Sequence, residues 1–265
     1  MALKDSGRQM SHVTPVQGLG WGILEAFSVD TPASLNPAIT SGKLLLPGGK
    51  TITLSDSDFD YIGPAANGLI SDDDITSVFF SPSAYFEATD TAVPTANSGA
   101  IYSNLTGTKT NPNDIRLYTA TAASGAVTKI VWGDWYNVQA VNLGSANIGA
   151  TGDKLQSLFE GINGRAAYCI GIVGVTTTTV STDTGTISLQ SLDLETGAEV
   201  ELGTLVCTVK TLDLDVLANI DWSELTTYKV VQPLQPLVVE CTEASTAGVV
   251  QVYGLFGGYP SELYV

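Results

Sequence analysis

Three closely spaced carboxylates come nearest to a metal-binding motif in this sequence. The run Asp56 to Asp60 (DSDFD) places an acid at every second position, as at the start of a calcium loop. However, Tyr61 stands where an EF-hand needs glycine, and Asn67 stands where it needs glutamate. The segment is therefore not an EF-hand. A different Ca2+ or Mg2+ site and a solvated acidic loop both stay open, and the candidate ligands are Asp56, Asp58 and Asp60, with Asp72 to Asp74 as further acids.

Three neighbouring aromatic residues provide a second candidate site, for carbohydrate. Trp132, Trp135 and Tyr136 combine flat apolar faces with polar groups, which suits stacking on a sugar ring. In a strand, Trp132 and Tyr136 share one side and Trp135 takes the other, so we expect at least one of them in the core. A carbohydrate-binding or receptor-binding module that uses these residues is one alternative function.

The sequence disfavours histidine-dependent catalysis, because the only histidine, His12, lies in the expected N-terminal arm. The sequence contains no P-loop, GxSxG, HExxH or CxxC pattern. Its 27 acidic residues offer no distinctive pair for glycoside hydrolysis, so a polysaccharide-degrading enzyme is the least favoured function. We expect no enzymatic activity and no cofactor other than a divalent cation.

The three cysteines indicate a reducing compartment. Cys169, Cys207 and Cys241 cannot pair completely, and their spacing fits no zinc motif. Each lies in an apolar, strand-like run, which predicts buried and reduced thiols.

The charge balance excludes two classes of partner. Only 14% of the 265 residues are charged, and the net charge is −16. Nucleic acid and anionic membrane surfaces are therefore not expected partners, since both select clustered Lys and Arg. Residues 1–11 show no secretory signal, and the longest apolar run, Ala166 to Val175, is too short to span a membrane.

The elements that must position these residues are short strands between Gly-rich turns. The expected fold class is all-β, with antiparallel β-sandwich or jelly-roll-like modules. One short helix is expected at about 153–162, because four apolar residues follow helical spacing and Asp153 can cap its start: Leu155, Leu158, Phe159 and Ile162. A single helical turn is expected at 221–224 (DWSE).

Three hairpins organise the strands. One turns at Ala123-Ser124-Gly125, and the last pairs 229–241 with 248–256 and places Cys241 opposite Val250. The longest, Thr184 to Thr211, turns at 195–198, and its apolar residues change phase on both arms. Matching them places Leu189 opposite Leu205 and Leu192 opposite Leu202. Tip and base would then bury opposite faces, so the tip needs a covering surface.

Three regions follow from this pattern. Residues 1–26 read as an extended docking arm, 27–147 as a first β-module and 148–265 as a second, jelly-roll-like one, with Gly144 to Gly152 as a small-residue connector. The expected subunit contacts lie on the arm and on the hairpin tip: Trp21, Ile23, Phe27, Leu192, Leu194, Val200 and Leu202.

The overall character resembles virion structural proteins of tailed bacteriophages, such as capsid decoration (cement) proteins, head fibres and tail tubes. The resemblance is carried by the Thr/Ser/Gly/Ala-rich run from Ala166 to Phe256, the start without a leader and the arm MALKDSGRQMSHVTPVQGLGWG. It implies a non-enzymatic protein, made in the host cytoplasm, that forms homo-oligomers (a trimer is favoured) and binds other virion proteins. A tail-tube protein and a jelly-roll capsid protein are alternatives of the same class.

Overall fold

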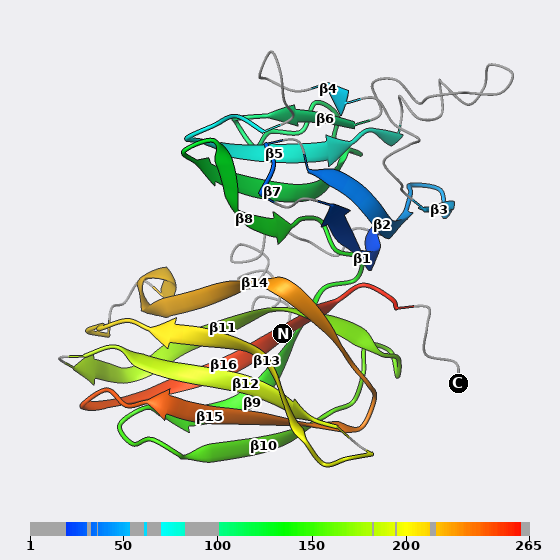
Figure 1. Cartoon of the computed structure of the whole chain (residues 1–265). Helices are drawn as coiled ribbons and strands as arrows, with labels where there is room; N and C mark the ends of the chain where they lie inside the picture. Colours follow the sequence, from blue (N-terminus) through cyan, green and yellow to red (C-terminus); the bar gives the residue numbers. More distant parts are fainter. Residues whose placement is uncertain are drawn as a thin grey trace, which may run out of the picture. The chain divides into compact units, whose positions relative to one another are not determined.

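The chain divides into two β-rich units, and the boundary in the sequence lies between Asn137 and Val138. The computed structural model describes residues 20–30, 33–35, 37–53, 61–62, 70–82, 101–181, 183–193, 195–212 and 216–260. The all-β prediction is confirmed (Figure 1). The division falls before β9 (Gln139–Asn147), whereas the sequence placed it after residue 147. We call residues 14–137 the N-terminal unit and the part from Val138 the C-terminal unit.

The N-terminal unit contains a three-stranded and a five-stranded sheet. The first has the order β1-β2-β3 and the second β4-β6-β5-β7-β8, and only the β4–β6 pair among them is parallel. The predicted turn at Ser124-Gly125 is confirmed, with positive φ angles of 56° and 80°. The bounds are β1 Gly22–Asp30, β2 Ala38–Leu45, β3 Thr51–Thr53, β4 Tyr61–Ile62, β5 Ile75–Phe80, β6 Ile101–Asn104, β7 Ile115–Ala123 and β8 Ala126–Trp132.

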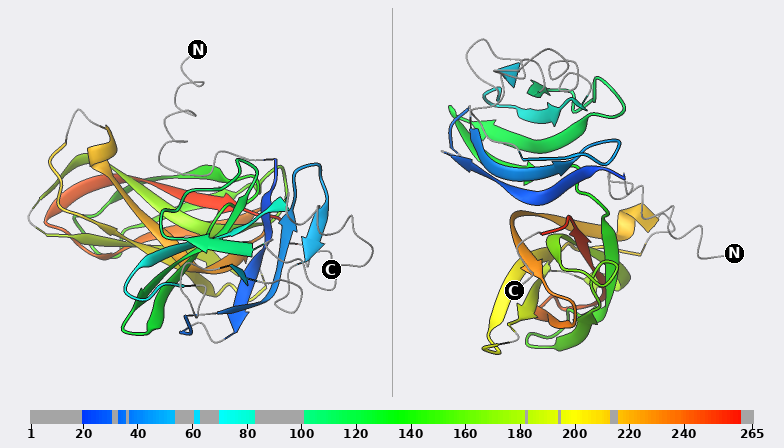
Figure 2. Two further views of the ribbon diagram at one scale, coloured as in Figure 1. Left: turned by 90° about the horizontal axis from the view of Figure 1, so that it is seen from above. Right: turned by 90° about the vertical axis from the view of Figure 1, so that its right-hand side faces the viewer.

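The C-terminal unit is a sandwich of two four-stranded sheets, ordered β10-β15-β12-β13 and β14-β11-β16-β9. Figure 2, right, views it roughly along its strands. Besides β9, the bounds are β10 Lys154–Phe159, β11 Ala167–Ser181, β12 Gly185–Leu192, β13 Glu199–Cys207, β14 Ile220–Val231, β15 Gln235–Glu243 and β16 Ala247–Gly257, with a 3-10 turn at Val216–Asn219.

The pairing in this unit is nested. β9 pairs with β16, β10 with β15, β11 with β14 and β12 with β13, all antiparallel. This is the pattern of one long hairpin rolled into two layers, which is the jelly-roll topology. The jelly-roll character predicted for the second module is therefore confirmed.

The core of the C-terminal unit lies between its two sheets. The rings of Phe159 and Phe256, both fully buried, lie 4.5 Å apart. The rest of this core is mainly Ile, Leu and Val from both sheets, and it also includes the three cysteines, as the strand alternation requires.

The predicted helix at 153–162 is wrong. Residues 154–159 form β10, which pairs residue by residue with β15. Leu155 and Phe159 are four positions apart, a spacing that suits a strand face as well as a helix face. Leu158 tells the two apart, because 59% of its side chain is exposed in the strand. The segment adopts a strand because the edge of β15 offers it a ladder of backbone hydrogen bonds. The helical turn expected at 221–224 is also wrong, since these residues belong to β14.

The last predicted hairpin is also wrong. β15 and β16 follow each other in sequence but lie in different sheets, so their short connection crosses from one layer to the other. It is tied to the end of β9 by a hydrogen bond of 2.8 Å from the Ser245 N–H to the Ile148 carbonyl. Cys241 and Val250 both lie in the core, as predicted, but they are not a cross-strand pair. The apolar residues of the two strands can face the same core both in a hairpin and in a corner that joins the two layers.

Candidate functional site

A groove runs along one side of the C-terminal unit, where two sheet edges lie next to each other. β13 and β14 are the end strands of different sheets, so among the described strands each has one edge without a partner. Side chains connect the two edges at two points. Lys229 Nζ donates to the Glu201 carbonyl at 2.6 Å, and the Thr208 Oγ1 hydroxyl donates to Asp221 Oδ1 at 2.7 Å. The groove lies between these contacts.

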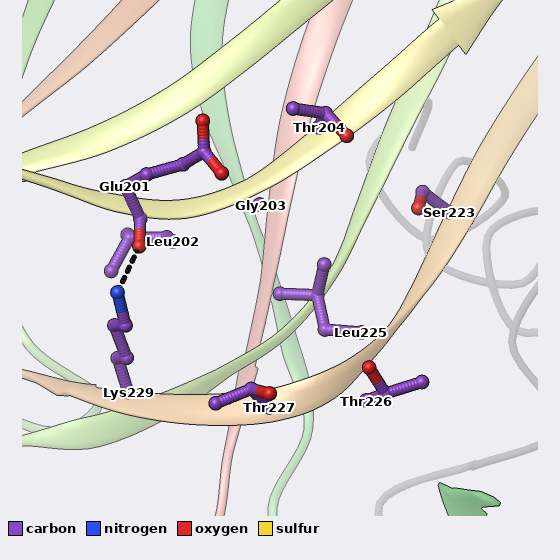
Figure 3. A pocket seen from close by; sticks show the side chains of 9 residues that line it. All are labelled: Glu201, Leu202, Gly203, Thr204, Ser223, Leu225, Thr226, Thr227 and Lys229. Carbon is purple, nitrogen blue, oxygen red and sulfur yellow. Dashed lines mark hydrogen bonds between the residues drawn. The ribbon is translucent and has the colours of Figure 1, made fainter. Parts of the chain in front are cut away.

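A large bulge in β14 opens the groove. β14 pairs with β11 at Lys229–Cys169 and next at Glu224–Gly171. Four residues, 225–228, therefore oppose the single residue Ile170, and this stretch bows away from its ladder. The groove has a volume of about 400 Å3. It is lined from β13 by Glu201, Leu202, Gly203 and Thr204, and from β14 by Ser223, Leu225, Thr226, Thr227 and Lys229 (Figure 3).

The floor of the groove depends on a glycine. Leu225 points from β14 toward Gly203 on β13 (Figure 3) and is 7% exposed. A Cβ atom at position 203 would lie 2.3 Å from Leu225 Cδ2. Any larger residue at 203 would push Leu225 out, so the two strands can approach each other here only at a glycine.

The walls of the groove carry groups that can form hydrogen bonds. Four residues with hydroxyl groups line the groove, Thr204, Ser223, Thr226 and Thr227, together with Glu201. The lining contains neither histidine nor cysteine, and its one carboxylate, that of Glu201, accepts from the Ser188 hydroxyl at 3.4 Å. These groups could hydrogen-bond to a molecule in the groove.

One end of the groove is closed by a nearly buried ion pair. Asp221 Oδ1 accepts from Lys210 Nζ at 2.7 Å, and the two side chains are 10% and 11% exposed. Lys210 Nζ also donates to the Ile220 carbonyl at 2.7 Å, and the Lys210 backbone pairs with Val180. Several of the large apolar side chains that the described residues expose lie within a few positions of this ion pair: Val206, Val209, Leu212 and Trp222.

Sequence reasoning missed most of this groove. Ser223 fell within an expected helical turn, while Thr226, Thr227 and Lys229 carried no motif. Gly203 was the available signal, because glycine inside a strand often marks a bulge or a close backbone approach.

The long hairpin is confirmed, but its predicted register is wrong. Leu189 lies opposite Gly203, and after a bulge Gln190 lies opposite Glu201. The extra residue on β13 is Leu202, which the bulge turns into the unit's own core, where it is 5% exposed. The expectation that the tip buries the opposite face is therefore wrong for Leu202. Leu192 and Val200 are half-buried, and their contact with a second copy stays a prediction; Leu194 lies outside the described residues.

The apolar residues assigned to the N-terminal arm belong to the fold of the N-terminal unit. Ile23 is fully buried in β1, and its N–H donates to the Asp134 carbonyl at 2.8 Å. Phe27 is 6% exposed, and its ring lies 5.2 Å from that of Trp132. Since these two side chains are already covered, they are not free to dock on a neighbour. Trp21 is half-buried, directly before the strand.

The aromatic residues predicted to stack on a sugar are mostly buried. Trp132 and Trp135 are 7% and 2% exposed, and Trp132 packs edge-on against Tyr118 at 5.3 Å. Tyr136 is half-buried. The clustering of these aromatics is explained by the core of the N-terminal unit, and a stacking site made from them is wrong.

The proposed metal ligands Asp56, Asp58 and Asp60 lie outside the described residues. Of the further acids, Asp72 and Asp73 hold the β7–β8 turn: their carboxylates accept from the Gly125 N–H at 2.8 Å and the Ser124 N–H at 3.0 Å. No group of three or more potential metal ligands occurs within the part of the chain that the structure describes.

The three thiols are free and buried, as predicted. Burial raises the pKa of Cys169 and Cys207 to about 12, and nearby Asp221 adds to the rise for Cys207. Burial also raises the pKa of Cys241. Because the folded protein holds these protons more tightly than the unfolded chain, the thiols cost no stability below about pH 9, the ordinary thiol range.

We therefore expect the free energy of unfolding to fall as the pH rises from about 9 toward 12. Urea titrations across this range check it, and a Cys169→Ala variant should lose part of the decline. At pH 8, iodoacetamide should label the native thiols slowly and all three in urea. Rapid labelling of the folded protein would contradict the burial.

No helix among the described residues is long and apolar enough to cross a membrane.

Comparisons with known proteins found similar solved structures but no matching family. No family model and no curated protein matches the chain. The chain is similar to the infectious bursal disease virus VP2 subviral particle protein at 15% identity, covering 91% of this chain and 67% of that one with a TM-score of 0.23. A structure of the Gt strain of that virus matches at 13% identity, covering 94% and 69%, with a TM-score of 0.26. At such TM-scores the likeness supports no conclusion about function.

Proposed function

We propose that this chain is a non-enzymatic structural subunit of a virus particle that associates with further copies of itself. The observation that carries the proposal is the nested eight-strand topology of the C-terminal unit. Jelly rolls of this kind occur in viral capsid proteins, lectins and cupins. The fold by itself does not choose among these classes, so the side chains must.

Side-chain chemistry disfavours the other two classes. A cupin-type metal enzyme needs clustered metal ligands, and none occurs in the described part of the chain. A lectin that stacks sugars on Trp132 and Trp135 is disfavoured because both rings are buried. A structural subunit requires neither feature.

Within this class, the finer assignment we propose is a capsid decoration or minor capsid protein, of bacteriophage type, that forms a trimer and binds other virion proteins. A tail-tube protein and a jelly-roll capsid protein are the alternatives. The C-terminal unit carries fourteen acidic and four basic residues, a net charge of −10. That charge disfavours a nucleic-acid contact by this unit and favours a protein partner.

Self-association should depend on the exposed apolar residues around the Lys210–Asp221 ion pair. Val206 and Trp222 are 52% and 46% exposed in the C-terminal unit, and burying them in a subunit contact is favourable. We expect Val206→Gln with Trp222→Gln to weaken self-association by about tenfold or more, as measured by sedimentation velocity. Their exposure means that folding should be unaffected.

The matched control replaces Ile75 and Leu105, which are 60% and 48% exposed in the N-terminal unit, with glutamine. Equal weakening in both variants would remove the specific role of the Val206–Trp222 surface. A full-length chain that stays monomeric at every concentration would contradict the proposed function.

A further inference from the structure

The groove between β13 and β14 has the features of a site for an added strand. Between its two end contacts, β13 contributes residues 202–207 and β14 contributes residues 222–227, and no backbone hydrogen bond joins these stretches within the described chain. The unpaired edge of β13 can therefore receive a partner backbone. About six residues of extended chain, roughly 20 Å, match this length.

The lining defines the chemistry of the occupant. Leu202 and Leu225 form an apolar floor, while threonine and serine hydroxyls line the walls. An extended segment whose successive side chains alternate between small apolar and polar types would satisfy both surfaces. Because the C-terminal unit has a net charge of −10, a segment without net negative charge is favoured.

Residues 1–19 of this chain meet the charge condition. Residues 1–19 contain Lys4, Arg8 and Asp5, a net charge of +1. The charged stretches among the other undescribed residues are all acidic: 54–60, 83–100, 213–215 and 261–265. Residues 12–17 (HVTPVQ) are rich in β-branched side chains, and their single proline fits an added strand where its nitrogen faces away from the ladder.

We propose that the β13–β14 groove of one copy binds residues 1–19 of a second copy as an added strand on β13. This rests on the proposed function, since a segment supplied by another copy joins two subunits, which a particle requires. The proposed binding site ends at the contact between Lys229 and Glu201 on one side and at the contact between Thr208 and Asp221 on the other.

Disulfide trapping between full-length chains tests the proposal. One chain carries Thr227→Cys in the groove, and the other carries a cysteine at Gln9, Thr14 or Gln17 in turn, so that no single register is assumed. The native thiols interfere little, because they are buried and their pKa values are raised. After mixing and mild oxidation, at least one pair should give a cross-linked dimer about tenfold above the control.

The control is Thr128→Cys, an exposed threonine on β8 of the N-terminal unit. Cross-linking no greater than this control at all three positions would overturn the proposal. A disulfide that forms only within one chain carrying both cysteines would also overturn it, because the segment would then occupy its own groove. Sedimentation on the same samples separates the two claims: oligomers without cross-links remove the groove contact alone, and monomers remove the proposed function as well.

Discussion

Replacing Asp221 with alanine should lower the free energy of unfolding of the C-terminal unit by about 3 kcal/mol or more. Asp221 accepts from Lys210 Nζ and Thr208 Oγ1, both at 2.7 Å, and from the Thr208 N–H at 3.1 Å. The substitution leaves the Lys210 ammonium, whose side chain is 11% exposed, without its carboxylate. A buried charge that loses its partner costs more than the pair itself contributes. Urea unfolding followed by circular dichroism measures the loss.

The matched control is Glu199→Ala. Glu199 accepts from Lys154 Nζ at 2.9 Å, but these side chains are 45% and 38% exposed. After the substitution, water solvates the lysine and Glu240 remains its partner at 3.2 Å. We expect a loss below about 1 kcal/mol. Equal losses at positions 199 and 221 would contradict the view that burial gives the Asp221 pair its importance.

Asp221→Asn refines this prediction. The amide oxygen can still accept from Thr208, but the negative charge that Lys210 needs is absent. We expect a stability between those of the wild type and Asp221→Ala. An asparagine variant as stable as the wild type would mean that the hydrogen bonds to Thr208 are sufficient.

Local patterns carried the prediction of fold class and of several turns. Alternating apolar residues in β12 and β15 and the Ser124-Gly125 turn depend on neighbours in sequence, so they are visible without a structure. The burial of the three cysteines follows from the same alternation, because each lies on the inward side of its strand.

Long-range pairing could not be predicted in the same way. The apolar faces of β15 and β16 match as well for a hairpin as for a corner between two layers, and the strand order decides. That order depends on which partners β11 and β12 find, and these partners lie far away in sequence. The sequence therefore shows which residues of β15 and β16 face the core, but not which strands pair with them.

The β12–β13 hairpin shows how a real sequence pattern can be misinterpreted. The change of phase on β13 between Leu202 and Leu205 is real, and the structure accounts for it by one extra residue on that strand. On β12, however, Leu189 and Ser191 stay on the buried side. An alignment of apolar residues alone predicts that both arms of the hairpin change face at the same level. It does so because the apolar pattern of a bulge on one arm is the same as that of a change of face on both arms.

A substitution in β10 should have the second large effect on stability. Phe159→Ala should lower the free energy of unfolding by about 3–5 kcal/mol, because the ring is fully buried against Phe256 at 4.5 Å and its removal leaves a cavity. Leu158→Ala should change it by no more than about 0.5 kcal/mol, since this side chain is 59% exposed. Both are measured by urea unfolding.

The pair of variants discriminates strand from helix because residues 158 and 159 are adjacent. On a helix, Leu158 and Phe159 would both lie on the apolar stripe with Leu155, and both truncations would be costly. On a strand, neighbours point to opposite faces, so only one truncation opens a cavity. Similar losses at both positions would therefore restore the helix and remove β10 from the edge of its sheet. The nested pairing would then lose its β10–β15 pair, and the jelly-roll topology would fail with it.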